Sequence, residues 1–76
     1  MTGKETKQIT IARIMSAVER AREKHPNFVN TPEQAVAIAA EEFGEWAKEI
    51  NDNRPLLAQE EALDLIAVLV RYLENN

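Results

Sequence analysis

The amino-acid sequence predicts an all-α fold, a short bundle of three helices that homo-oligomerisation completes. Apolar residues recur at steps of three and four along three stretches, and no stretch shows the alternation typical of a strand. Breaks that contain Pro and Asn separate these stretches. With 76 residues and no Cys, the chain predicts a single domain over residues 1–76 whose small core has no disulfide support, so association between copies is expected.

The first helix is predicted over about residues 6–24. Its apolar stripe consists of Ile11, Ile14, Met15, Val18 and Ala21. The segment His25-Pro26-Asn27 ends it, because Pro disfavours helical geometry at the preceding residue and Asn suits a turn. The histidine in this segment is expected at a helix end or on the surface, and not as a catalytic group.

The second helix is predicted over about residues 32–50, and Thr31-Pro32-Glu33-Gln34 is its start signal. Thr31 can cap free backbone N–H groups, Pro32 fits the first helical position, and Gln34 can reach back as in a capping box. Trp46 is expected in the core. It belongs to an apolar stripe that also contains Ala35, Ala39, Phe43 and Ile50.

The third helix is predicted over about residues 56–74 and is apolar nearly all round. Its apolar side chains are Leu63, Leu65, Ile66, Val68, Leu69, Val70, Tyr72 and Leu73. Short connections make consecutive helices antiparallel neighbours, but two other helices are too few to cover this surface. A homodimer or a homotetramer is therefore expected.

The charge of the chain argues against several classes of function. A net charge of −4 disfavours nucleic acid as a partner, because binding to phosphate backbones needs surplus Lys and Arg. In a DNA-binding helix-turn-helix, only the basic first helix would engage phosphates, since the other two are acidic. No stretch is long and apolar enough for a signal peptide or a membrane span, which predicts a cytoplasmic protein without membrane association.

Acidic residues occupy positions where a buried helix face should be apolar. They lie in the segments Glu41-Glu42-Phe43-Gly44-Glu45 and Glu60-Glu61-Ala62-Leu63-Asp64. Each segment holds an acidic pair three residues apart, which places both carboxylates on one side of the helix. On the third helix, Glu61 falls inside the apolar arc and Asp64 on its flank, so these carboxylates need a positive partner.

A divalent metal ion is the partner that the sequence predicts for Glu42, Glu45, Glu61 and Asp64. Few cations are available to neutralise these carboxylates: Lys48, Arg54, Arg71 and the row on the first helix. Mg²⁺, or Mn²⁺, prefers carboxylate oxygens and keeps positions open for water and phosphate oxygens. Because the sequence has no nucleophile elbow, Gly-rich phosphate loop or Cys/His metal motif, any chemistry is expected from metal-activated water.

The pattern Glu-Glu-x-x-Glu on one helix followed by Glu-x-x-Asp on the next resembles the MazG-like, all-α nucleoside triphosphate pyrophosphohydrolase superfamily. The matching segments are Glu41-Glu42-Phe43-Gly44-Glu45 and Glu61-Ala62-Leu63-Asp64. The fifteen residues between Glu45 and Glu61 are within the spacing of that family. The segment 42–50 also looks like the family, and the resemblance covers about residues 32–73.

The resemblance implies a Mg²⁺-dependent hydrolase that cleaves a nucleoside triphosphate between its α and β phosphates, giving a nucleoside monophosphate and pyrophosphate. Carried over by position, the four carboxylates named above would hold Mg²⁺, and the expected catalytic residues are Glu41, Glu42 and Glu45. Candidates for phosphate contacts are Lys48, Arg54 and Arg71, although solvated or helix-end charges fit each of them equally well. Many members of the family have a further helix that helps to cover the nucleotide. In this chain, the first helix or a partner subunit is expected to cover it instead.

Two other interpretations of the sequence stay open. A non-catalytic helical dimer would bind a protein partner or a nucleotide without turnover, although unneeded carboxylates beside a core are costly. Alternatively, the four carboxylates are solvated residues at the rim of a dimer. Replacing all four by Gln separates these cases, because only a metal site predicts the loss of Mg²⁺-dependent stabilisation.

Overall fold

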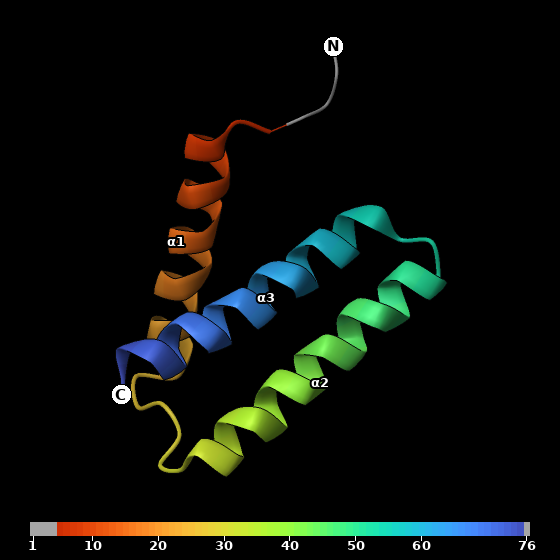
Figure 1. Ribbon diagram of the computed structural model, residues 1–76. Helices are drawn as coiled ribbons and strands as arrows, with labels where there is room; N and C mark the ends of the chain where they lie inside the picture. Colours follow the sequence, from red (N-terminus) through yellow and green to blue (C-terminus); the bar gives the residue numbers. More distant parts are fainter. Residues whose placement is uncertain (1–4, 76) are drawn as a thin grey trace.

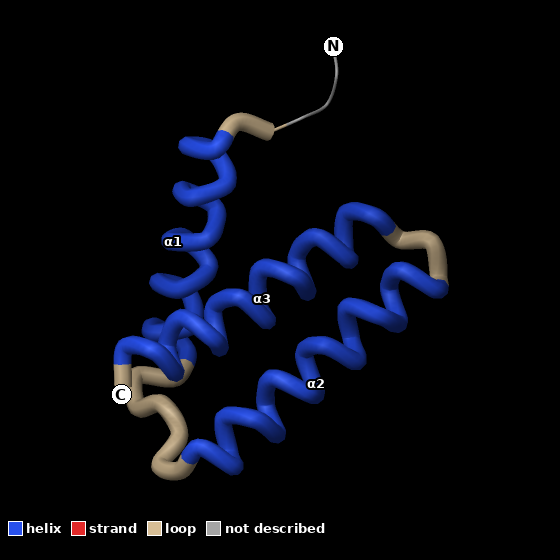
Figure 2. The backbone as a smooth tube through the Cα atoms, in the orientation of Figure 1, coloured by secondary structure: helices blue, strands red, loops and turns tan. Residues whose placement is uncertain are grey.

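The computed structural model describes residues 5–75, and three helices make up most of them (Figure 1). Helix α1 spans Lys7–Lys24, α2 spans Pro32–Asn51 and α3 spans Pro55–Glu74. Figure 2 shows that helices and loops account for the whole of the described chain, with no strand among these residues. The protein is all-α, and each helix boundary lies within one residue of the range that the sequence predicts.

The starts of the first two helices are capped by threonine side chains. The hydroxyl of Thr6 accepts a hydrogen bond from the backbone N–H of Ile9 at 3.1 Å, and the hydroxyl of Thr31 accepts one from Gln34 at 3.2 Å. Gln34 reaches back as predicted, but its side-chain oxygen accepts from the N–H of Asn30 at 2.9 Å. The capping box therefore closes one residue earlier than in the standard motif.

Helix α3 lies at the centre of the bundle, with α2 along one side and α1 along another (Figure 1). Helices α2 and α3 form an antiparallel hairpin, as the short connection predicts. The backbones of α1 and α2 do not approach each other within the described residues, so the expectation that these two are antiparallel neighbours is wrong. The apolar faces of α3 explain this, because α1 packs Ile14, Val18 and Ala21 of its stripe against α3, while Ile11 and Met15 stay exposed. The loop between α1 and α2 carries the chain past α3.

The core of the bundle is small and consists mainly of alanine. Where α1 meets α3, Val18 is fully buried between Ala17 and Ala67, and four partly buried residues surround them: Ile14, Ala21, Leu63 and Val70. Small side chains let the two helices approach closely, but they remove little apolar area from water. The radius of gyration is 13.2 Å, against about 11 Å for a compact domain of this length, so the bundle is comparatively open.

Large apolar side chains remain exposed on the hairpin. Val36 and Phe43 of α2 are 68% and 55% exposed, and Leu69 of α3 is 46% exposed. All three line an apolar groove of about 460 Å³ between α2 and α3. Trp46, expected in the core, is only half-buried and packs edge-on against Phe43, with 5.8 Å between the ring centroids.

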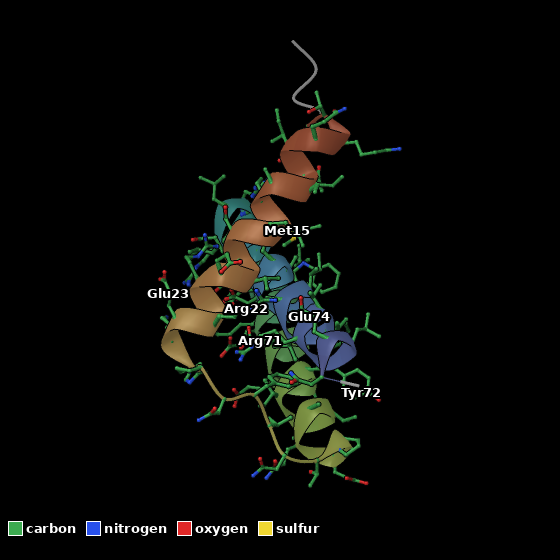
Figure 3. The ribbon with its side chains drawn as sticks, turned by 90° about the vertical axis from the view of Figure 1, so that its left-hand side faces the viewer. Met15, Arg22, Glu23, Arg71, Tyr72 and Glu74 are labelled. Carbon is green, nitrogen blue, oxygen red and sulfur yellow. The ribbon has the colours of Figure 1, made fainter. Side chains whose placement is uncertain are left out.

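Arg71 joins the end of α1 to α3. Its side chain is 6% exposed and donates hydrogen bonds to the carbonyl oxygens of Ala21, at 3.1 Å, and His25, at 2.7 Å. Its guanidinium also lies over the ring of Phe28, 5.0 Å from the centroid. Figure 3 shows Arg71 at this junction, near Arg22 and Glu74, which form an ion pair between α1 and α3.

Within the described residues, no helix combines the length and apolar character that a membrane crossing needs.

Candidate metal centre

The turn between α2 and α3 brings the acidic segments of the two helices together. Asn53 has a φ of 58°, the left-handed conformation that Asn tolerates better than most residues, and its N–H donates to the carbonyl of Ile50 at 3.1 Å. Glu45 precedes Asn53 by eight residues and Glu61 follows it by eight. In an antiparallel hairpin, positions equidistant from the turn face each other, which places these two carboxylates side by side.

Three carboxylates gather at this level of the hairpin. Glu42 and Glu45 lie one helical turn apart on α2, and Glu61 lies opposite on α3. Each of the three offers one oxygen, and these oxygens all lie within 4.8 Å of one another. We refer to Glu42, Glu45 and Glu61 as the acidic cluster.

The acidic cluster is partly shielded from water. Glu42 and Glu61 are half-buried, whereas Glu45 is exposed. The Oε2 atom of Glu42 is buried and has no hydrogen-bond partner within residues 5–75. A buried carboxylate oxygen without a partner is costly, and a cation beside it would remove that cost.

Crowding and burial make the cluster hold protons more tightly than isolated carboxylates do. Burial, followed by the charge of Glu45 and a hydrogen bond with it, raises the pKa of Glu61 to about 7. Burial also raises the pKa of Glu42, and the charges of Glu45, Asp64 and Glu41 add to this effect. Near neutral pH, the cluster without a metal ion therefore carries fewer negative charges than its three carboxyl groups suggest.

The donor set of the acidic cluster fits a hard divalent cation. Carboxylate oxygens are the ligands that Mg²⁺ and Mn²⁺ prefer, and three protein ligands leave octahedral positions for water or substrate. The three oxygens lie within 4.8 Å of one another, so the carboxylates would have to draw closer together to bind one such ion. The exposed carboxylate of Glu45 leaves the cluster open to solvent on one side.

Asp64, the fourth predicted ligand, does not belong to the acidic cluster. It lies on α3 one turn beyond Glu61, and with Glu41 and Glu42 it lines a cavity between α1 and the hairpin. Burial raises its pKa, while the positive charges of Arg20 and Lys24 act in the opposite direction. The structure thus gathers three of the four predicted ligands and places the fourth beside them, facing α1.

The three cations predicted to contact phosphates do not gather at one place. Arg54 lies at the start of α3, where its guanidinium is 3.5 Å from a carboxylate oxygen of Glu49. Lys48 is an exposed residue in the last turn of α2. Arg71 lies in the last turn of α3 and does line the cavity, but its guanidinium is hydrogen-bonded to backbone carbonyls.

Two cations that the sequence analysis did not single out act on one of the predicted carboxylates, Asp64. Arg20 and Lys24, on the last turns of α1, line the same cavity as Glu42 and Asp64. Their spacing of four residues on one helix was a signal in the sequence that they share a face. The signal was missed because which face of α1 meets the hairpin depends on the crossing of α1 and α3, which periodicity does not give.

Comparisons of this chain with protein-family models, curated proteins and solved structures give no match. The fold and the site therefore define the class of protein by themselves. It is a small all-α protein of three helices that carries an acidic cluster with the donor atoms and spacing to hold a metal ion.

Proposed function

We propose that this protein is a Mg²⁺-dependent nucleoside triphosphate pyrophosphohydrolase, which cleaves its substrate between the α and β phosphates. The observation that carries the proposal is the gathering of Glu42, Glu45 and Glu61, from two helices, with oxygens within 4.8 Å. The motif resemblance to MazG-like pyrophosphohydrolases supports it, because the same residues form the two halves of that pattern. Mn²⁺ is the alternative metal ion, because carboxylate ligands suit it as well.

The acidic cluster would supply the ligands for the metal ion, which would act as a Lewis acid on phosphate oxygens and lower the pKa of a bound water. The water oxygen bonds to one of the phosphorus atoms that flank the α–β bridging oxygen. The bond from that phosphorus to the bridging oxygen breaks, and its electron pair stays on the leaving phosphate group. Glu41, which is exposed and lines the cavity beside Glu42, would accept the proton from the water, while Glu42 and Glu45 would orient it.

The apolar groove supports a second candidate, a non-catalytic helical dimer that binds a protein partner or a nucleotide without turnover. Val36, Phe43 and Leu69 line this groove and are exposed, and apolar side chains that cluster on a surface often mark an interface. Assembly and catalysis are compatible, so the groove supports a homodimer under either candidate. Turnover decides between them.

The test is an assay of the purified protein with Mg²⁺ and a panel of ribo-, deoxyribo- and modified nucleoside triphosphates. We expect equal amounts of monophosphate and pyrophosphate from at least one substrate, and loss of both with Glu45→Gln. Glu33→Gln is the matched control, because it removes the same charge from an exposed position in the first turn of α2. Diphosphate and inorganic phosphate as products, or no turnover by the folded protein, would contradict the proposal.

A further inference from the structure

A cavity of about 550 Å³ lies between α1, the loop that follows it and the hairpin. Its size is within the range of small-molecule sites in proteins. The charges on its walls are separated: Glu41, Glu42 and Asp64 line it from the hairpin, whereas Arg20 and Lys24 line it from α1. The acidic wall continues directly into the acidic cluster, because Glu42 belongs to both.

Arg20 and Lys24 differ from Arg13 and Arg22, the paired arginines of α1, in having no partner within residues 5–75. Arg13 pairs with Glu5, and Arg22 pairs with Glu19 and Glu74. Within residues 5–75, by contrast, neither Arg20 nor Lys24 makes an ion pair or a side-chain hydrogen bond. Both are exposed and reach Asp64 only through their longer-range field, so their donors are available to a ligand.

Part of the lining of the cavity is apolar. Phe28 and Val29 from the loop, together with Ile38 of α2, line it and are half-buried. The guanidinium of Arg71 covers the ring of Phe28 and is held by backbone carbonyls, which fixes the loop that carries this apolar surface. The cavity therefore offers one charged wall of each sign together with apolar side chains, which suits an anionic chain attached to an aromatic or aliphatic group.

We propose that this cavity binds the nucleotide, with Arg20 and Lys24 holding the phosphate chain and the apolar side chains of Phe28, Val29 and Ile38 contacting the nucleoside. The proposal rests on the function proposed above, because it takes the acidic wall to be the metal-bearing side. A phosphate chain between the two walls would have its charge balanced by the metal ion on one side and by the two cations of α1 on the other.

The test uses inorganic tripolyphosphate in the presence of Mg²⁺ as a probe of the phosphate chain alone, with binding measured by calorimetry. We expect the double substitution Arg20→Gln and Lys24→Gln to weaken binding about tenfold or more. The matched control is Lys7→Gln with Arg22→Gln, which removes the same charge from the same helix outside the cavity lining. Its binding should stay within about twofold of the unmodified protein.

A second variant that keeps both charges tests the proposal even if the double Gln variant does not fold. Arg20→Lys with Lys24→Arg should bind tripolyphosphate nearly as well as the unmodified protein if the two positions hold phosphate through their charge. An adenosine triphosphate analogue with an α,β-methylene bridge should bind more tightly than tripolyphosphate, and Phe28→Ala should reduce that difference. Equal weakening in both double variants would show a general charge effect and overturn the proposal.

The proposal and the proposed function fail in different ways. If the unmodified protein does not bind tripolyphosphate, or the Arg20 and Lys24 double variant binds it undiminished, the cavity does not hold the phosphate chain. Pyrophosphate release by that double variant at the unmodified rate would also overturn the inference, while leaving the hydrolase intact. Binding that depends on Arg20 and Lys24 without any turnover would support the cavity and refute the hydrolase.

Discussion

Glu61 shows how the environment of one side chain sets the chemistry of the site. Its place inside the apolar arc of the third helix predicts partial burial from sequence alone, and the structure confirms it. The sequence does not give the identity of its neighbours, because these depend on the register of the hairpin about Asn53. Glu45 and Glu42 are among those neighbours, and burial, with the negative charges around it, raises the pKa of Glu61 to about 7.

The raised pKa of Glu61 predicts that the metal-free protein loses stability as the pH rises. The folded state binds a proton at Glu61 that the unfolded chain, with an ordinary pKa of 4.5, has already lost. This stabilisation is therefore complete below pH 4.5 and lost as the pH passes about 7. With a chelator present to remove metal ions, the midpoint temperature of thermal unfolding should decrease as the pH is raised from about 5 to about 8. Glu61→Gln should make this decrease smaller.

Mg²⁺ should reverse this pH dependence, since the metal ion binds the deprotonated carboxylates. It should raise the thermal midpoint at about pH 8 and have little effect near pH 5. Glu60→Gln, at the exposed neighbouring position, is the control and should leave both effects in place. The same fall in the chelator with Glu61→Gln as with the unmodified protein would refute the part assigned to Glu61.

At the scale of the elements, Arg71 holds the C-terminal end of α1 against α3 through hydrogen bonds. The sequence presents it as a cation in the last turn of a helix and therefore as a candidate for phosphate binding. The structure adds a second role, because the side chain is buried and donates to the carbonyls of Ala21, His25 and Pro26 around the end of α1. Sequence reasoning missed this role because its partners are backbone atoms, which have no signature in the sequence.

Arg71→Met should destabilise the protein by about 2 kcal/mol or more, because hydrogen bonds to charged donors are lost and carbonyls are left unpaired. Arg22→Met is the matched control, since it removes the same group from an exposed ion pair with Glu74, and should have a much smaller effect. Urea unfolding followed by circular dichroism measures both. Equal effects of the two substitutions would show that Arg71 does not hold α1 in place.

At the scale of the whole molecule, the arrangement of the helices follows from α3, which packs against both α1 and α2. The sequence predicts three helices, their boundaries and a third helix apolar on two sides, and the structure has these features. The neighbours of α1 were predicted wrongly, because helical periodicity fixes which face of a helix is apolar but not which partner it meets. The gathering of Glu42, Glu45 and Glu61 was predictable because two acidic pairs flank a short turn.

The exposed apolar groove predicts self-association through α2 and α3. Sedimentation velocity should give twice the 8.6 kDa mass of the chain, and Leu69→Lys should shift the protein to the monomer. Ile9→Lys is the control, because Ile9 is 52% exposed on α1 and lies outside the groove. A monomer in the unmodified protein at micromolar concentrations, or dissociation by both substitutions, would contradict this assignment.

The central claim is that Glu42, Glu45 and Glu61 hold a divalent cation, and calorimetric titration with Mg²⁺ and with Mn²⁺ at about pH 8 tests it most directly. The account predicts saturable binding by the unmodified protein, and its loss when Glu42, Glu45 and Glu61 are replaced by Gln. Glu23, Glu33 and Glu60 are exposed, and replacing them by Gln should leave binding intact. No saturable binding, or loss with both sets of substitutions, would contradict the account and favour carboxylates that are merely solvated at the surface.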